Sequence, residues 1–250
     1  MPACIKPRFH QVDLQGEPPF APGQSITVGE GMTVIAGHNG SGKTTFVRRM
    51  KVLTRDAGWG RETGMDLNTL EWLVFMEEGT TVEPGEPWLP LKQWLHTHQA
   101  DAALRGRLGD QATRLWHIMI SPFDSRAPHL ELRINKDGSI DVMDTSSQAL
   151  VNRSYNGASD CKELALAVIL SVRKIWRLDL PLVGDGLLTV LSSARADGML
   201  RCIRIGTSQS ILTVQEDSGT DIPSTWQICH DNKTGLSILA AVTTRLLIQT

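Results

Sequence analysis

Short apolar runs and amphipathic segments alternate along most of this chain. The short runs, bounded by glycine or polar residues, predict buried strands at 32–36, 180–185 and 210–215. Longer segments with apolar residues three and four positions apart predict helices from Thr44 onward, over 160–177 and over 193–204. Strands that alternate with helices are typical of a largely parallel sheet flanked by helices. The pattern therefore predicts an α/β fold.

Two other patterns predict an antiparallel part. Residues 129–144 alternate between apolar and polar side chains around NKDG, a turn sequence that favours a hairpin. The segment 225–239 has a similar arrangement and predicts a second hairpin. The apolar run 236–248, which overlaps the end of that hairpin, predicts a closing core helix.

The segment from about 59 to 120 predicts a lobe that is partly helical and partly irregular. Residues 69–78, TLEWLVFMEE, predict a strand, and a proline-rich turn follows. Residues 90–120 predict a helix in two pieces, broken near Gly106 and Gly109. Tryptophans are concentrated in this lobe, which indicates a partner surface or a small additional core; the core is the simpler interpretation.

The composition fits one domain over residues 1–250. The chain is 41% hydrophobic and 21% charged, which is ordinary for a globular protein with a core. A net charge of −2 means that nucleic-acid contact needs a local basic patch. Two clusters offer one, and they are Arg48, Arg49, Lys51 and Arg55, and Arg173, Lys174 and Arg177. A solvated helix face explains both clusters more simply, so nucleic acid stays an open alternative.

Cysteine usage and the absence of long apolar runs point to the cytoplasm. The four cysteines are scattered without CxxC spacing, which favours a reducing compartment. The first residues do not form a signal peptide, and no run of 18 apolar residues could span a bilayer. His96 and His98 form an isolated HxH pair, which is more typical of exposed histidines than of a metal site. We expect a cytoplasmic protein without membrane insertion.

The segment GHNGSGKTT at 37–45 matches the complete P-loop pattern, with a buried strand before it and a helix after it. Backbone N–H groups of such a loop and the helix N-terminus bind phosphates. Lys43 would reach the β- and γ-phosphates, and Thr44 would offer its hydroxyl to Mg²⁺. The predicted cofactors are ATP and Mg²⁺. The predicted nucleotide-binding residues are Gly37, His38, Asn39, Gly40, Ser41, Gly42, Lys43, Thr44 and Thr45.

A P-loop also needs a carboxylate that supports Mg²⁺ at the end of another buried strand. Asp185 ends the run LPLVGD and fits this role. Gln215 ends the next predicted strand and is a weaker candidate for orienting water. The predicted catalytic residues are therefore Lys43, Asp185 and Gln215, with Thr44 and Asp185 at the metal.

GHNGSGKTT resembles the GxNGSGK[ST]T loop of ABC ATPases, in particular the branch that includes SMC proteins and DNA-repair ATPases. Residues 155–170, YNGASDCKELALAVIL, occupy the place of the LSGGQ signature motif of that family in a degenerate form. The helix entry KELALA resembles the SMC branch more than transporter subunits. No sustained heptads indicate a coiled coil. The resemblance implies a coil-less ABC-ATPase head.

The resemblance also implies a head-to-head dimer, as a homodimer or a hetero-assembly, with ATP between the P-loop of one subunit and the signature of the other. The residues that would face ATP in trans are Asn156, Gly157, Ala158 and Ser159. A helix N-terminus with small residues suits close approach to an anion. Alternatively, these residues only cap a core helix, with Asp160 as part of the cap.

Two positions depart from the family pattern. The family has a catalytic Glu after the strand Asp, where this chain has Gly186. The usual switch His corresponds to Gln215 or Glu216, and Gln93 is the candidate for the Gln loop. Loss of a general base typically costs about 10²–10⁴-fold in rate. We therefore expect an ATP hydrolase that binds tightly and turns over slowly.

The leading hypothesis is an SMC-like ABC ATPase whose nucleotide state controls dimerisation and a partner or effector protein. The resemblance suggests a setting in DNA repair or phage defence. Two alternatives remain: the ATPase subunit of a membrane transporter, and a nucleotide-binding structural module that does not hydrolyse ATP.

Overall fold

The central element is a six-stranded sheet with the order β11-β10-β3-β9-β8-β4. The computed structural model describes residues 7–14, 17–189, 191–215, 225–231 and 234–241. In sheet order the strands are Leu236–Ala241, Trp226–Asp231, Gly31–Gly37, Gln209–Gln215, Leu182–Asp185 and Phe75–Met76. All neighbours are parallel except β10 and β11, which pair antiparallel. The predicted α/β fold with a mostly parallel sheet is confirmed.

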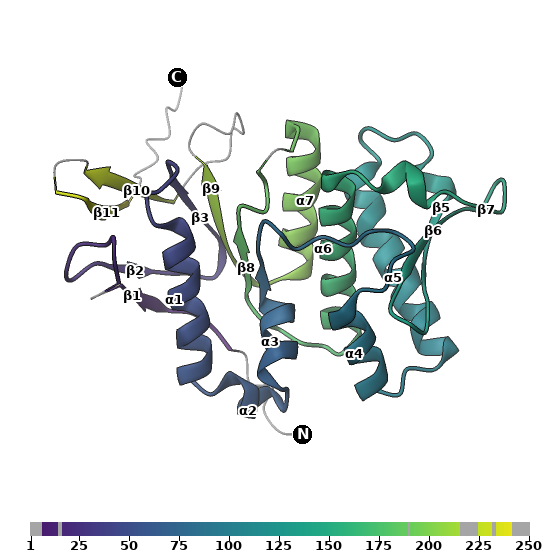
Figure 1. Cartoon of the computed structure of the whole chain (residues 1–250), viewed down its shortest axis with the longest axis horizontal. Helices are drawn as coiled ribbons and strands as arrows, with labels where there is room; N and C mark the ends of the chain where they lie inside the picture. The colour runs from purple at the N-terminus through teal and green to yellow at the C-terminus, as the bar shows by residue number, and fades with distance from the viewer. Residues whose placement is uncertain (1–6, 15–16, 190, 216–224, 232–233, 242–250) are drawn as a thin grey trace, which may run out of the picture.

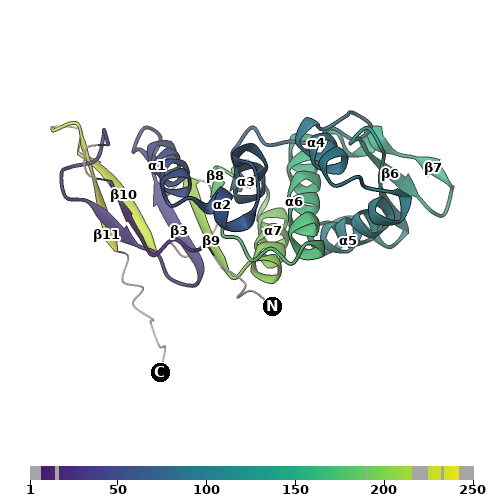
Figure 2. The ribbon, with the colours of Figure 1, turned by 90° about the horizontal axis from the view of Figure 1, so that it is seen from below.

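Helices pack against this sheet and continue beyond its β4 edge. The helices are α1 Lys43–Asp56, α2 Trp59–Thr63, α3 Leu67–Val74, α4 Leu89–Thr97, α5 Ala102–Ile120, α6 Ala158–Ile175 and α7 Ser193–Gly206. Figure 2 shows α1, α2 and α3 on one side of the sheet, and α6 and α5 farther along the molecule. Helix α6 is buried on nearly every side, as expected of a helix that is apolar all round.

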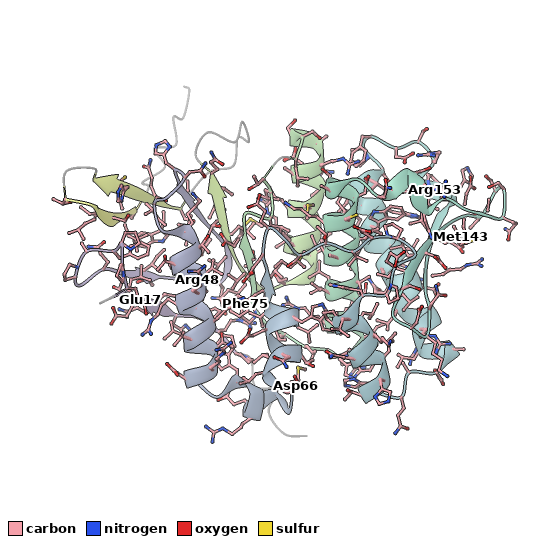
Figure 3. The ribbon with its side chains drawn as sticks, viewed as in Figure 1. Glu17, Arg48, Asp66, Phe75, Met143 and Arg153 are labelled. Carbon is pink, nitrogen blue, oxygen red and sulfur yellow. The ribbon has the colours of Figure 1, made fainter. Side chains whose placement is uncertain are left out.

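Two small antiparallel sheets lie outside the central sheet. One pairs β1 Gln11–Asp13 with β2 Ser25–Thr27. The other consists of β5 Leu130–Ile134, β6 Ile140–Asp144 and β7 Ala149–Leu150. Short 3₁₀ turns lie at Ala127–His129 and Asn152–Tyr155. The two sheets lie toward opposite ends of the molecule (Figure 1), as do the labelled Glu17 and Met143 (Figure 3). The hairpins predicted over 129–144 and 225–239 are confirmed by the β5–β6 and β10–β11 pairs.

The strand predicted over 69–78 is wrong for most of its length. Asp66 caps α3 by accepting a hydrogen bond from the Thr69 N–H at 3.0 Å, and only Phe75 and Met76 are extended. An apolar run of this length fits either a buried strand or a buried helix. Here it forms a helix that buries Leu70 and the three residues from 72 to 74. The N-cap, which favours Asp, decides for the helix.

Two further predictions are corrected. The closing helix over 236–248 is wrong at its start, because residues 236–241 form β11; residues 242–250 lie outside the described residues. Helix α5 continues through Gly106 and Gly109, and the interruption comes earlier, between α4 and α5. An ideal Cβ at Gly109 would lie 2.5 Å from the Leu132 carbonyl oxygen, so this glycine permits close approach of β5 and does not break the helix.

The tryptophans of the lobe contribute to a core. Trp59, Trp72, Trp94 and Trp116 are all buried. Trp72 meets Trp88 edge to face with ring centroids 5.4 Å apart, and Trp94 meets Trp176 in the same way at 4.3 Å. Edge-to-face contacts add to the apolar burial of such rings. The additional core, and not a partner surface, explains the four buried rings.

Candidate nucleotide site

The P-loop joins the carboxyl end of β3 to the N-terminus of α1. The Ser41 N–H donates to the His38 carbonyl at 3.2 Å, which closes the turn, and α1 begins at Lys43. The Lys43 ammonium donates to the carbonyl oxygens of Gly37 and His38 at 2.6 and 2.7 Å. Lys43 is therefore held over the loop, so its ammonium lies where phosphate oxygens would approach the helix N-terminus.

The strand order explains how distant residues meet at this loop. Gln215, at the end of β9, is directly opposite Gly37 in the parallel β3–β9 register. On the other side of β9, the Thr213 hydroxyl donates to Asp185 Oδ1 at 2.6 Å and accepts from the Gly186 N–H at 3.2 Å. Thr213 thus fixes the carboxylate and the backbone that follows it.

A cavity of about 480 Å³ opens at this edge of the sheet. Its lining comprises Pro19, Asn39, Gly40, Gly42, Lys43, Thr44, Thr45, Glu78, Asp185, Gly186, Thr189 and Gln215. The structure therefore brings together Asp185, Gln215 and six of the nine predicted P-loop residues. The other three, Gly37, His38 and Ser41, do not line the cavity. The structure adds Glu78, which the sequence analysis missed because two adjacent acidic residues after an apolar run look like a solvated loop.

The lining fits a magnesium nucleotide chemically. Backbone N–H groups at the start of α1 and the Lys43 ammonium suit phosphate oxygens. The Thr44 hydroxyl and the Asp185 carboxylate are oxygen ligands of the kind Mg²⁺ prefers, usually with substrate phosphates completing its coordination. No cluster of three or more His, Cys, Asp or Glu that could hold a metal ion occurs among the described residues.

Gln93 does not contribute to this cavity. It lies on the exposed side of α4, and the cavity lining includes no residue of that helix. The candidate Gln loop is therefore wrong. Glu216, the other candidate for the switch position, lies outside the described residues. His98 of the HxH pair bonds through Nδ1 to the Trp94 carbonyl at 2.9 Å and stacks on that ring, which is a local packing role.

The predicted signature residues lie at the start of α6 and do not line the cavity of their own chain. Gly157 is the N-cap of α6, and Asn156, Gly157 and Ala158 are exposed. No side chain caps the helix there. Asp160 forms an ion pair with Arg195 of α7 at 2.8 Å and does not cap the backbone. The alternative in which Asp160 serves as the cap is therefore wrong.

Arg195 also joins a buried carboxyl group to this cluster. Its guanidinium donates to Glu163 Oε2 at 3.1 Å and lies over the Phe123 ring, 4.4 Å from the centroid. The pKa of Glu163 is raised to about 8, chiefly by burial and also by the neighbouring Asp160, while Arg195 opposes the shift. Oε1 of Glu163 is buried without a hydrogen-bond partner among the described residues. Arg195 thus connects the exposed start of α6 to the interior.

We expect Glu163→Gln to flatten the pH dependence of stability between about pH 5 and 8. The folded pKa of about 8 lies above the ordinary 4.5, so the protonated carboxyl stabilises the fold fully below 4.5 and this contribution is lost as pH rises through 8. Urea unfolding at several pH values measures this, with the exposed Glu62→Gln as the control. An equal fall in stability for wild type and the Glu163 variant contradicts it.

The first basic cluster is largely engaged within the fold, whereas Lys174 and Arg177 of the second cluster are exposed. Three ion pairs involve the first cluster, and they are Arg49–Glu17, Lys51–Glu77 and Arg55–Glu71. Arg48 is exposed on α1 (Figure 3). In the second cluster Arg173 is 1% exposed and donates to the carbonyls of Leu73 and Pro181, and its burial lowers its pKa to about 9. Arg173 therefore cannot belong to a nucleic-acid surface.

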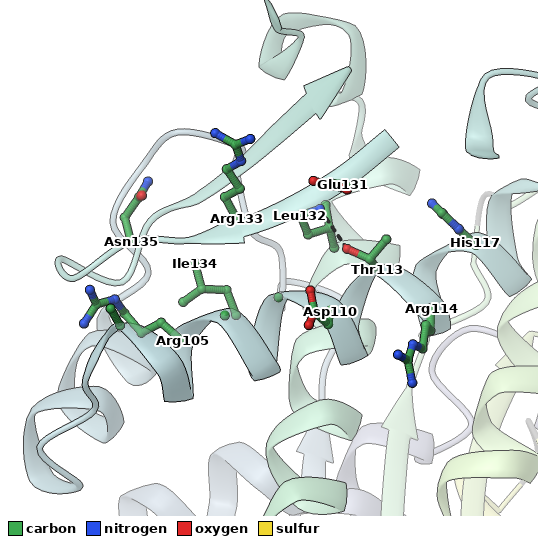
Figure 4. Close-up of a pocket in the computed structure, with 13 residues that line it drawn as sticks. Arg105, Asp110, Thr113, Arg114, His117, Glu131, Leu132, Arg133, Ile134 and Asn135 are labelled. Atoms are coloured by element: carbon green, nitrogen blue, oxygen red, sulfur yellow. Dashed lines mark hydrogen bonds between the residues drawn. The ribbon is translucent and has the colours of Figure 1, made fainter. Parts of the chain in front are cut away.

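A larger cavity, of about 680 Å³, lies between α5 and β5, away from the P-loop. Figure 4 shows Arg105, Arg114 and Arg133 around it together with Asp110 and Glu131. The Leu132 N–H donates to the Thr113 hydroxyl at 2.8 Å and fixes β5 on the helix. The mixed charges give this cavity no preference for one class of ligand. Within the part of the chain that the structure describes, no helix has the length and apolar character needed to cross a membrane.

Comparison with known proteins identifies the fold. No family model matches the sequence, and no curated protein matches it. The SMC head domain from Thermotoga maritima matches with a TM-score of 0.56 at 14% identity, over 94% of this chain and 99% of that chain. An SMC head bound to the C-winged helix domain of ScpA matches with a TM-score of 0.67 at 12% identity, over 96% and 98%. The chain therefore has the fold of an SMC head domain, which is the fold of an ABC-type P-loop ATPase.

Proposed function

We propose that this chain binds ATP with Mg²⁺ and uses its nucleotide state to control self-association and a protein effector. The observation that carries this proposal is the shared cavity of Lys43, Thr44 and Asp185 at the carboxyl edge of the sheet. Lys43 would bind the β- and γ-phosphates, and Thr44 and Asp185 would hold the metal. The proposal treats residues 1–250 as one ABC-ATPase-like domain with a lobe at about 59–120.

The dimer in this proposal is an ATP sandwich, either of two identical chains or with a related one. The exposed residues 156–158 and the partly exposed Ser159 would face the nucleotide of the opposite subunit. The ion pair of Asp160 with Arg195 supports this, because it offsets the negative charge beside the approaching phosphates. The ScpA domain bound to one of the similar SMC heads supports a protein partner for this chain.

We place the assembly in the cytoplasm and in DNA repair or phage defence, as the resemblance favours. Nucleic acid stays an open alternative as a partner. Three of the four residues in the first basic cluster form ion pairs and Arg173 of the second is buried, whereas Lys174 and Arg177 are exposed.

Gly186 favours a second candidate, a module that binds ATP without hydrolysing it. Gly186 has a φ of 62°, a left-handed conformation that disfavours other residues. Leu187 and Leu188 are buried and carry no acidic group. A side chain therefore cannot orient water from this position as it does in the family.

We expect phosphate release by the pure chain to fall below about 1 s⁻¹, the lower end of the common enzymatic range. The reason is that the position after Asp185 supplies no carboxylate, so water must be oriented from another position of the cavity lining than in the family. Steady-state phosphate release at saturating MgATP measures the rate. A rate of several per second would contradict slow turnover, and no product in a single turnover would favour the non-hydrolysing module.

A further inference from the structure

Glu78 lies where the family's catalytic carboxylate is missing. It follows β4, the strand next to β8 in the sheet, and lines the same cavity as Lys43 and Asp185. An ideal Cβ at Gly186 would lie 3.4 Å from Cβ of Glu78 and 3.6 Å from its Oε2. The Glu78 side chain therefore lies in contact with the position at which a side chain of residue 186 would begin, beside the Thr189 hydroxyl at 3.3 Å.

The backbone around Glu78 is anchored to both neighbouring helices. The Thr80 N–H donates to the Glu77 carbonyl at 2.9 Å, and the Glu77 N–H donates to the Thr80 hydroxyl at 3.0 Å, so the turn is closed. Lys51 of α1 forms an ion pair with the Glu77 carboxylate. The Val82 N–H donates to the Cys161 carbonyl of α6 at 3.1 Å. The turn thus presents Glu78 to the cavity from a fixed position.

The two acidic residues of this turn differ in what they contact. Glu77 is engaged by Lys51, outside the nucleotide cavity. Glu78 is exposed, and among the described residues it forms no hydrogen bond or ion pair. Glu78 interacts electrostatically with the buried Lys162, whose pKa is lowered by burial while Glu78 opposes that shift. The Glu78 carboxylate is therefore available to accept a proton in the cavity, whereas the Glu77 carboxylate pairs with Lys51 outside it.

We propose that Glu78 is the general base of ATP hydrolysis in this chain, taking over the role that Gly186 cannot perform. This inference rests on the proposed function. The water oxygen forms a bond to the γ-phosphorus while the bond from that phosphorus to the β–γ bridging oxygen breaks. The bridging oxygen leaves on ADP with the bonding electrons. Glu78 accepts one proton from the water and releases it to solvent, so the products are ADP, phosphate and one proton.

Other groups near the cavity are less suited to this role. Asp185 accepts from Thr213 and is the proposed metal carboxylate. Gln215 has an amide, which can orient water but is a poor base. Asp160 is held by Arg195 on a different surface of the same chain. Glu78 is the carboxylate of the cavity lining that remains.

The test compares Glu78→Gln with Glu77→Gln, two isosteric changes at adjacent positions. We expect Glu78→Gln to lower the single-turnover rate by about 10²-fold or more, because a carboxamide cannot accept the proton. Its dissociation constant for MgATP, measured by calorimetry, should stay near that of wild type. Protein passed through a desalting column after incubation with MgATP should carry ATP in the Glu78 variant and ADP in wild type. Glu77→Gln keeps both hydrogen bonds between residue 77 and Thr80 that close the turn, and it loses only the exposed ion pair with Lys51, which contributes little, so it should behave as wild type in all three measurements.

Each other outcome overturns the inference. A Glu78→Gln rate within about threefold of wild type would exclude Glu78 as the base. A loss of MgATP affinity of about tenfold or more, which corresponds to the loss of a polar contact, would make Glu78 a binding residue instead of a base. If wild type binds MgATP but forms no ADP in a single turnover, the inference fails while the ATP-binding proposal stands. If wild type does not bind MgATP, the proposed function itself fails.

Discussion

Lys43→Ala should abolish measurable binding of MgATP while the protein remains folded. The ammonium is held over the P-loop by the carbonyls of Gly37 and His38, where it would meet the phosphates. Hydrogen bonds to charged groups are worth about 1.5–3 kcal/mol each. Loss of the two bonds that the ammonium would form to the β- and γ-phosphates therefore weakens binding by roughly 10²-fold or more. Calorimetric titration with MgATP measures the affinity, and circular dichroism checks the fold.

Arg48→Ala is the matched control for this change. Arg48 lies on the same helix, is exposed and does not line the cavity, so its loss removes a cation without touching the P-loop. Unchanged affinity in a folded Lys43→Ala protein would refute the P-loop assignment. Equal weakening by both variants would point to a general charge effect.

Gly157→Glu should abolish ATP-dependent self-association. Gly157 is exposed at the N-cap of α6 with φ −68° and ψ 152°, a conformation open to other residues, so the fold tolerates the change. An ideal Cβ would lie 2.9 Å from Oδ2 of Asp160, so that side chain must shift and a second negative charge joins it. Two carboxylates would then oppose the phosphates of the facing subunit. Sedimentation velocity with and without MgATP measures the mass.

Ser147→Glu adds the same charge at an exposed position of the β6–β7 turn, near the end of the molecule in Figure 1, and should leave association unchanged. The nucleotide affinity of the isolated Gly157→Glu chain should also be close to that of wild type, because Gly157 does not line its own cavity. If the sedimenting mass of wild type and of both variants is the same with and without MgATP, the ATP-sandwich dimer is contradicted.

The parts of the fold that sequence predicted well are those in which local pattern and turn chemistry agree. The NKDG hairpin and the strand that runs into Gly37 both combine an apolar pattern with a specific turn. The pattern failed at 69–78 and after 236, because an apolar run fits a buried helix and a buried strand equally well. Asp66, which precedes the run, distinguishes the two at α3, because it caps the helix by accepting from the Thr69 N–H.

The candidate site divides in the same way. The P-loop residues and Asp185 could be found because each stands at a fixed place in a local motif, and the structure places Asp185 and six of the nine P-loop residues around one cavity. Glu78 could not, because only the pairing of β4 with β8 brings it beside Gly186, 108 residues farther along the chain (186 − 78). A carboxylate supplied by a neighbouring strand cannot be recognised from the spacing of residues within one motif.

The position of β9 between β3 and β8 also has a kinetic consequence. The P-loop strand and the Asp185 strand are not neighbours, so the cavity is complete only after residues 209–215 have been synthesised and inserted between them. Contacts between segments so far apart in sequence form slowly because the loop entropy must be overcome first. A nascent chain that ends before β9 would thus have the P-loop sequence without the complete binding cavity. ATP would therefore stabilise only a chain whose sheet is complete, so nucleotide binding would be detected late in folding.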